Sequence, residues 1–149
     1  MEIIRKDTDY AIRALLHLAL SDGREVSCSK LARSCGTPRT VTYKVMGRLV
    51  AAGLVVSRAG RTGGFRLSRR AGRSTLLDTV NAVQGPLTVS RCVIKPALCP
   101  QHNGCPVSKK WAALQRGLVD TLAQTSVDDL VGALKRGGAS VGVESRRDI

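Results

Sequence analysis

The sequence has few aromatic residues and no long hydrophobic run. Its four aromatic residues are Tyr10, Tyr43, Phe65 and Trp111. Any core must therefore be built mainly from aliphatic side chains. The longest apolar stretch, Ala14–Leu20, is interrupted by His17 and is far shorter than the roughly 20 residues that cross a bilayer. The N-terminus carries acidic residues and no cleavage-site pattern, so no signal peptide is expected. These absences predict a cytoplasmic protein with no membrane partner, in which disulfides would be rare.

The sequence patterns of several enzyme classes are also missing. There is no glycine-rich phosphate-binding loop, and with only two histidines in the chain no Ser–His–Asp arrangement stands out. No pair of carboxylates occurs in a context typical of general acid–base catalysis. The sequence therefore predicts a protein that is not an enzyme.

Acidic residues are absent from more than a third of the chain. Between Val26 and Leu77 there is no Asp or Glu, against eleven Lys and Arg. The formal net charge is +13, and residues 1–75 contribute +10 of it, from fifteen basic minus five acidic residues. A long basic tract without carboxylates is typical of a surface that binds a polyanion. We expect that polyanion to be double-stranded DNA, because the tract coincides with a DNA-binding motif.

That motif is a helix-turn-helix. A first helix is predicted over residues 6–20, a second begins at Ser27 and stops at Gly36, and a third opens with Thr37 as N-cap and ends at Gly53. Two helices joined by a short glycine-containing turn are the signature of the motif, and its second helix enters the major groove. The predicted DNA-facing residues of that helix are Arg39, Thr40, Tyr43, Lys44 and Arg48.

A β-hairpin is predicted directly after the third helix. Residues 54–57 and 65–68 are short apolar or alternating runs with a glycine-rich turn between them. A hairpin in this place is the wing of a winged helix-turn-helix. Arg58 and Arg61, at the tip of the hairpin, could reach phosphates or a minor groove.

The second half of the chain predicts an interface with a second copy. A helix capped by Ser74 or Thr75 ends at Gly85, and another begins at Val107 with a single apolar stripe. Such a stripe either folds back on the domain or pairs with a twin, and pairing suits a DNA reader that needs two half-sites. The predicted homodimer interface consists of Trp111, Leu114, Leu118 and Leu122. The expected fold is mainly α with a small β-hairpin wing: a winged helix-turn-helix plus a long dimerisation helix.

Three of the five cysteines, Cys92, Cys99 and Cys105, lie in one stretch that proline and glycine punctuate. This stretch is predicted to be a loop rather than a helix or strand. Thiolates are the ligands of iron–sulfur clusters. Zinc is an alternative with His102 as the completing ligand, although structural zinc sites favour closer cysteine pairs. A cluster-free thiol–disulfide sensor is a further alternative. The two remaining cysteines lie within the helix-turn-helix and are expected to be small buried packing residues.

The sequence resembles the Rrf-two family of transcriptional regulators, typified by IscR and NsrR, over about residues 4–130. The resemblance is carried by D-Y-A-I-R-A-L-L-H-L-A, R-A-G-R-T-G-G-F-R-L, V-Q-G-P-L, the cysteines within L-C-P and G-C-P, and W-A-A-L-Q. It implies a homodimeric winged-helix repressor whose long helix crosses to the partner subunit. It also implies a [2Fe–2S] or [4Fe–4S] cluster on Cys92, Cys99 and Cys105, through which the protein would sense iron–sulfur status, nitric oxide or redox stress.

A cluster held by three thiolates takes a fourth ligand. IscR-like members use a histidine three residues after the last cysteine, but this chain has Ser108 there. NsrR-like members use an aspartate of the other subunit near the start of the first helix, and Asp9 matches it, with His102 as the fallback. The predicted division of the chain is a DNA-binding domain over residues 1–85, a cluster-binding loop over 86–106, the dimerisation and C-terminal helices over 107–136, and a disordered tail over 137–149. The dimer is expected to bind a palindromic operator.

Overall fold

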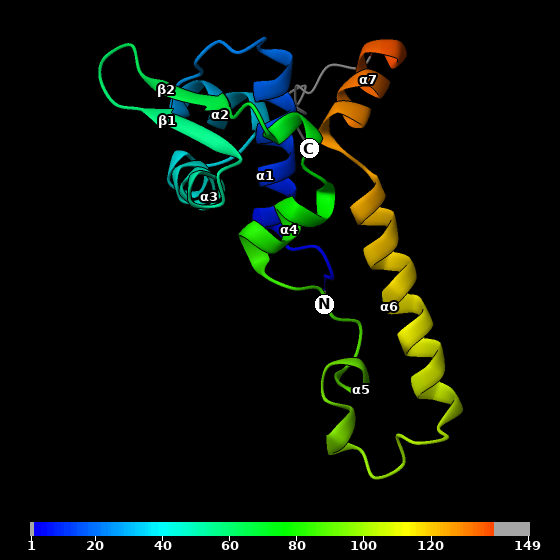
Figure 1. Ribbon diagram of the computed structural model, residues 1–149. Helices are drawn as coiled ribbons and strands as arrows, with labels where there is room; N and C mark the ends of the chain where they lie inside the picture. The colour runs from blue at the N-terminus through cyan, green and yellow to red at the C-terminus, as the bar shows by residue number, and fades with distance from the viewer. Residues whose placement is uncertain (1, 139–149) are drawn as a thin grey trace, which may run out of the picture.

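The computed structural model describes residues 2–138, which fold mainly as helices with one two-stranded hairpin (Figure 1). The elements in chain order are α1 (Lys6–Leu20), α2 (Cys28–Cys35), α3 (Arg39–Ala51), β1 (Val55–Arg58), β2 (Gly64–Leu67), the 3-10 turn η1 (Ala71–Arg73), α4 (Leu76–Gln84), α5 (Arg91–Ile94), the 3-10 turn η2 (Pro96–Leu98), α6 (Pro106–Gln124) and α7 (Val127–Gly137). The prediction of a mainly helical winged helix-turn-helix is confirmed.

One aliphatic cluster holds α1, α2, α3, the hairpin and α4 together. Leu15 and Leu18 of α1, Leu31 of α2 and Leu49 of α3 are all at most 1% exposed. Full burial of such a side chain contributes about 1.5–3 kcal/mol. Phe65 is the aromatic member of the cluster, so the core is built from aliphatic side chains as the composition predicts.

Local capping signals set the boundaries of the helix-turn-helix. The Ser27 hydroxyl accepts a hydrogen bond from the backbone N–H of Lys30 at 3.3 Å and caps α2. Gly36 ends α2 in the left-handed conformation, with φ of 63°, which suits glycine. The prediction of Thr37 as N-cap of the next helix is wrong, because its hydroxyl lies 2.6 Å from the Thr42 hydroxyl instead and α3 begins one residue later than expected.

The wing is tied to the start of α2. In the antiparallel hairpin Val55 pairs with Leu67 and Arg58 with Gly64. Its second strand also bridges Val26, since Val26 and Phe65 exchange two backbone hydrogen bonds of 2.9 Å. A Cβ atom on Gly64 would lie 2.5 Å from the Val26 carbonyl oxygen. The close approach of the two backbones therefore requires glycine at this position.

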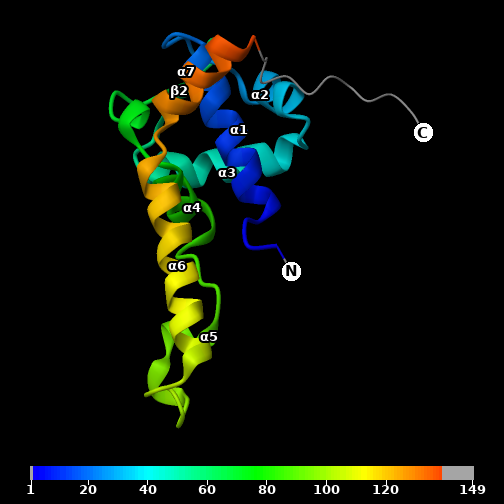
Figure 2. The same ribbon diagram turned by 90° about the vertical axis from the view of Figure 1, so that its right-hand side faces the viewer.

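The chain leaves the body of the molecule after α4, and the long helix α6 runs from the far end back to the body, where α7 lies (Figures 1 and 2). Ser108 is the buried residue of α6 within the described chain. At the other end, the backbone N–H of Leu76 donates to the Thr125 carbonyl and that of Val127 donates to the Ser74 carbonyl, both at 2.9 Å. α7 consequently packs against α1 and η1.

Reciprocal caps begin the two helices that meet at this junction. Thr75 and Asp78 form a capping box at α4, and Ser126 and Asp129 form one at α7. α7 ends at Gly137 and is capped by Gly138, which is left-handed with φ of 64°, so the prediction that the disordered tail begins at Gly137 is wrong. The predicted disordered tail otherwise covers residues 139–149, which lie outside the described part of the chain.

Candidate nucleic-acid interface and cysteine segment

The first two turns of α3 present polar side chains to solvent while the opposite face is buried. Val45, Met46 and Leu49 are at most 1% exposed. The exposed side chains include four of the five predicted DNA-facing residues: Arg39, Thr40, Tyr43 and Lys44. Tyr43 is 68% exposed, so its ring is open to solvent beside the exposed Arg39, Thr40 and Lys44. This half of the helix is the one that enters the major groove in helix-turn-helix proteins.

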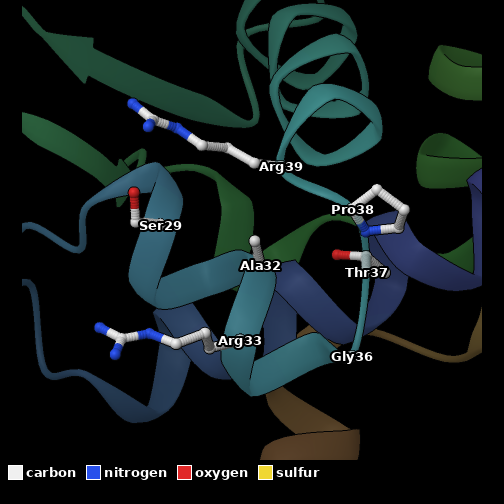
Figure 3. Close-up of a pocket in the computed structure, with 7 residues that line it drawn as sticks. All are labelled: Ser29, Ala32, Arg33, Gly36, Thr37, Pro38 and Arg39. Atoms are coloured by element: carbon white, nitrogen blue, oxygen red, sulfur yellow. The ribbon is translucent and has the colours of Figure 1, made fainter.

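A shallow hollow of about 780 Å³ lies where α2 meets α3. Figure 3 shows the Arg33 and Arg39 side chains extending to the same side of the motif, one from each helix. The hollow is otherwise lined by small side chains such as Ser29 and Thr37. Two guanidinium groups beside small polar residues suit contact with DNA phosphates. Arg33 was not among the predicted DNA-facing residues, and the sequence signal that points to it is its place in the acid-free tract, within the helix-turn-helix.

A second cleft, of about 480 Å³, separates α3 from the wing. Arg39 and Tyr43 line one wall, and Arg58 and Arg61 of the hairpin line the other. Arg58 Nη1 lies 3.8 Å from Glu25 Oε1. An ion pair this long and this exposed contributes about 0–1 kcal/mol, so it leaves Arg58 available for a phosphate.

The two cysteines of the helix-turn-helix have different surroundings. Cys35 is 2% exposed, and burial raises the pKa of its thiol, an effect that Arg13 partly opposes. Cys28 is half-buried, lines the cleft, and donates from Sγ to the Arg39 carbonyl at 3.8 Å. The prediction of a buried packing residue is thus confirmed for Cys35, whereas Cys28 packs against the core but is only partly buried.

Arg48 differs from the other predicted DNA-facing residues. Its Nη1 donates a 2.8 Å hydrogen bond to the Val83 carbonyl of α4 and lies 3.5 Å from Asp7 Oδ2. Lys44 Nζ lies 3.8 Å from the same carboxylate oxygen. DNA contact by Arg48 stays a prediction, but the structure places its guanidinium between α1, α3 and α4.

The stretch of residues 86–106, called the cysteine segment below, contains short helical turns. Cys92 lies within α5, Cys99 follows η2, and Cys105 is the N-cap of α6. The prediction of a plain loop is wrong here because Ser90 caps α5, accepting from the Cys92 N–H at 3.3 Å, and Pro96 opens η2.

All five cysteines are free thiols, and the three of the cysteine segment are half-buried. Within residues 2–138, no group of three or more His, Cys, Asp or Glu side chains is arranged to hold a metal ion. A hollow of about 380 Å³ in the segment is lined by Cys99 and His102 but not by Cys92 or Cys105. A single chain therefore does not gather the three predicted thiol ligands in one place.

The two predicted fourth ligands also differ in their contacts. His102 Nδ1 is buried and, within the described residues, has no hydrogen-bond partner. Asp9 lies in the first turn of α1, where its Oδ2 is 2.7 Å from Arg13 Nη2. Three free thiols and an unpartnered imidazole nitrogen fit an iron–sulfur cluster chemically. Within the described residues of a single chain, however, these groups do not form one metal-ligand set.

The apolar stripe of α6 is largely uncovered. Val107 is 54% exposed, Trp111 39% and Leu114 52%. Leu118 and Leu122, nearer the body, are half-buried. Contiguous apolar side chains of this size on a projecting helix are typical of an interaction surface. No helix within the described residues is both long and apolar enough to cross a membrane.

Comparison with known proteins gives a consistent family. The Rrf2 profile, described as "Iron-dependent Transcriptional regulator", matches residues 4–133. The chain is 31% identical over 132 residues to the "HTH-type transcriptional repressor NsrR" of Streptomyces coelicolor, covering 87% of this chain and 88% of that protein. It is 30% identical over 142 residues to "Protein aau3" of Rhizobium meliloti, covering 95% and 92%.

The fold is also that of a solved regulator. CymR, "the Global Cysteine Regulator of B. subtilis", superposes with a TM-score of 0.68 over 89% of this chain and 98% of that chain, at 20% identity. At this identity the likeness concerns the fold alone. Because the family profile covers nearly the whole chain and the wing and recognition helix stand where a DNA duplex can reach them, the protein belongs to the Rrf2 family of DNA-binding transcriptional regulators, which are not enzymes.

Proposed function

We propose that the protein is a homodimeric transcriptional repressor that binds a palindromic operator and responds to an iron–sulfur cluster held by the cysteine segment. The observation that carries this proposal is the placement of Cys92, Cys99 and Cys105. They are free, half-buried thiols on the segment that joins the end of α4 to the start of α6. In Figures 1 and 2 this segment lies at the far end of the molecule from the wing.

The DNA contacts in this proposal come from α3 and the wing. They are Arg39, Thr40, Tyr43 and Lys44 on α3, and Arg58 and Arg61 on the hairpin. Arginine and lysine suit guanine edges and phosphates, and threonine suits the thymine methyl group or the backbone. The exposure of the four α3 side chains and the absence of carboxylates from residues 26–77 support these roles.

The homodimer is proposed from the uncovered stripe of α6. This stripe lies along a helix that projects from the body and consists of Trp111, Leu114, Leu118 and Leu122, with Val107 beside them. A second copy is the partner that would cover them symmetrically, since a two-fold interface uses the same patch on both subunits. Two recognition helices related by such an axis would read two half-sites, which gives the palindromic operator.

The proposed ligands are Cys92, Cys99 and Cys105, with Asp9 of the partner subunit as the fourth and His102 as the fallback. When bound, such a cluster supplies an iron site that is sensitive to nitric oxide, oxygen or iron loss, because its fourth ligand is not a thiolate. The chain's own part is to bring the three thiols together. That requires the segment between α5 and α6 to close around them.

A second candidate is a cluster-free thiol sensor that uses the same cysteines. It is favoured by the absence of a metal-ligand group within residues 2–138 and by the likeness in fold to CymR of B. subtilis and to the "oxidized form" of Staphylococcus aureus CymR. In that case a two-electron oxidant such as a peroxide would join two of the thiols in a disulfide, both thiol protons being lost, and the shape of the segment would change. Iron and sulfide in purified protein would distinguish the two candidates.

The DNA-binding part of the proposal can be tested by selecting duplexes from random sequence with the purified protein. The expected result is an enriched palindrome bound by a dimer, and a Leu114→Asp variant that is monomeric and binds the same duplex far more weakly. If the protein retains no duplex, DNA binding is contradicted. Enrichment of a single half-site bound by a monomer would contradict the dimer.

A further inference from the structure

We propose that Arg48 is a positioning residue that ties the recognition helix α3 to the segment carrying Cys92, and that it does not contact DNA. The inference rests on the proposed function in one respect, namely that the cysteine segment is the sensor. It deepens that function by naming the side chains that would carry a change in the segment to the recognition helix.

The first link joins α3 to the end of α4. Arg48 Nη1 donates to the Val83 carbonyl at 2.8 Å and lies 3.5 Å from Asp7 Oδ2. Its side chain is 37% exposed. A charged donor on a partly buried carbonyl makes one of the stronger hydrogen bonds in proteins. To reach a phosphate, Arg48 would have to break that bond.

The second link fixes the end of α4 to the start of α1. Gln84 Oε1 accepts hydrogen bonds from the Arg5 N–H at 2.9 Å and the Thr8 hydroxyl at 2.7 Å, and Gln84 Nε2 donates to the Ile3 carbonyl at 2.9 Å. Thr8 is fully buried. The last turn of α4, with its Val83 carbonyl, is therefore set between α1 and α3.

The third link holds the chain beyond α4 to the long helix. Gln115 of α6 donates from Nε2 to the Leu87 carbonyl and accepts at Oε1 from the Val89 N–H, both at 2.9 Å. The next residue, Ser90, caps the turn that contains Cys92. The Gln115 side chain thus fixes the extended backbone between α4 and Cys92 to α6.

These links form a continuous physical path, which coupling between distant sites requires if it is to be carried by structure. Only nine positions separate Val83 from Cys92. Between them, Gln115 of α6 holds the backbone at Leu87 and Val89 by hydrogen bonds. A rearrangement of α5 would move Ser90 and Val89 against Gln115. The end of α4 would follow, and Arg48 would carry the displacement into α3.

The first test measures amide hydrogen exchange in α3 by mass spectrometry, in the absence of DNA, for wild type, Arg48→Met, Gln115→Leu and the double variant. Gln115→Leu should speed exchange in the second half of α3 by roughly threefold or more, beyond the twofold scatter of independent distant sites. In the Arg48→Met background the same change should have no further effect. Unchanged exchange in Gln115→Leu, or effects that add in the double variant, would overturn the proposal.

Two controls keep this test specific. Arg116→Leu alters an exposed neighbour on α6 and should leave exchange in α3 unchanged. Arg48→Lys keeps a donor on a flexible stem and should retain part of the wild-type protection. If Arg48→Met speeds amide exchange throughout the molecule, rather than in α3 and α4, the result would count against a positioning role.

The second test separates positioning from DNA contact by the salt dependence of binding to a 30-base-pair duplex of arbitrary sequence. Loss of a phosphate contact lowers the slope of log K against log salt by about one per site. Arg48→Met should leave the slope at its wild-type value, whereas Arg39→Met should lower it. An equal reduction in both variants would make Arg48 a phosphate contact and overturn the proposal. The exchange test needs neither DNA nor a cluster, so its failure would leave the proposed function intact. A wild type that does not bind DNA would overturn the proposed function but not the link between Gln115, Arg48 and α3.

Discussion

Replacing Arg39 by methionine should weaken DNA binding and make it less sensitive to salt. Arg39 occupies the first turn of α3 and lines both the hollow beside α2 and the cleft beside the wing. Methionine has a similar length and helix propensity, so the substitution removes the charge with little effect on the helix. The change therefore isolates the electrostatic contribution of one side chain.

The magnitude follows from the number of cations that face the duplex. Four proposed phosphate contacts in each protomer, from Arg39, Lys44, Arg58 and Arg61, make eight in a dimer. Each released counterion contributes about −0.9 to the slope, which gives about −7 and a loss of about 10⁴ in affinity between 50 and 200 mM salt. Arg39→Met removes one contact from each protomer, so the slope becomes less steep, about −5.4, and the loss of affinity over the same salt range falls to about 10³. The variant and wild type should thus differ about tenfold more at the lower salt concentration than at the higher one.

Fluorescence anisotropy with a labelled duplex, titrated at several potassium chloride concentrations, measures this slope directly. The matched control is Lys110→Met, which removes an exposed cation from α6. The control should keep the wild-type slope, because α6 lies away from the recognition helix. The reasoning is refuted if Arg39→Met has the wild-type slope, or if both variants lower it equally and only the total charge matters.

Three further predictions concern stability and local chemistry. Gly64→Ala should destabilise the fold by about 1–3 kcal/mol in urea unfolding, because its Cβ would lie 2.5 Å from a backbone oxygen, whereas Gly47→Ala, with open space around it, should stabilise α3 by about 1 kcal/mol; equal effects would contradict this account. Cys35 should resist iodoacetamide in folded, cluster-free protein while the other four cysteines react, because burial raises the pKa of its thiol, and labelling at an equal rate would show that it is accessible. The Ser126 hydroxyl and N–H hold the pKa of Asp129 below its ordinary value, so this cap stabilises α7 at neutral pH and is lost as the pH falls through the folded-state pKa; Ser126→Ala should raise that pKa in an NMR titration, and an unchanged value would exclude the hydroxyl as the main cause.

Signals that act within a few residues allowed much of the fold to be predicted. Ser27 and Gly36 delimit α2 as the sequence indicates, and the glycine-rich turn gives the hairpin to within one residue of its observed strands. Caps, turns and apolar spacing are local properties, so a single sequence contains them. The boundaries that were wrong, such as the N-cap of α3, differ by a single residue.

Contacts between distant parts of the chain could not be predicted in the same way. The sequence predicts DNA contact for Arg48, but it gives no sign of the hydrogen bond to the Val83 carbonyl, which lies 35 positions further along the chain. The docking of α7 on α1 likewise depends on tertiary packing that no local pattern encodes. The cysteine spacing indicates the kind of ligand, whereas the positions of the three thiols depend on α5 and η2, two short turns that proline and serine create within an expected loop.

Two features bear on which residue would be the fourth cluster ligand: the exposed apolar stripe of α6 and the His102 Nδ1, which has no hydrogen-bond partner within the described residues. Both features lie toward the end of the described chain that the proposed dimer would cover. A second subunit would cover the apolar stripe and bring its own Asp9 as a possible ligand. A closed cysteine segment in one chain would instead use His102. Comparing Asp9→Ala with His102→Ala for bound iron decides between these ligands.

The most direct test of the central claim is iron and sulfide analysis of protein purified without oxygen, together with its visible spectrum, for wild type and Cys99→Ala. Cys28→Ala serves as the matched control, since that cysteine lies in the DNA-binding half. The account predicts a coloured wild type and control with iron and sulfide in about equal amounts, and a colourless Cys99→Ala. A wild type that contains neither iron nor sulfide, even after reconstitution, would contradict the cluster and leave a repressor that senses through its thiols.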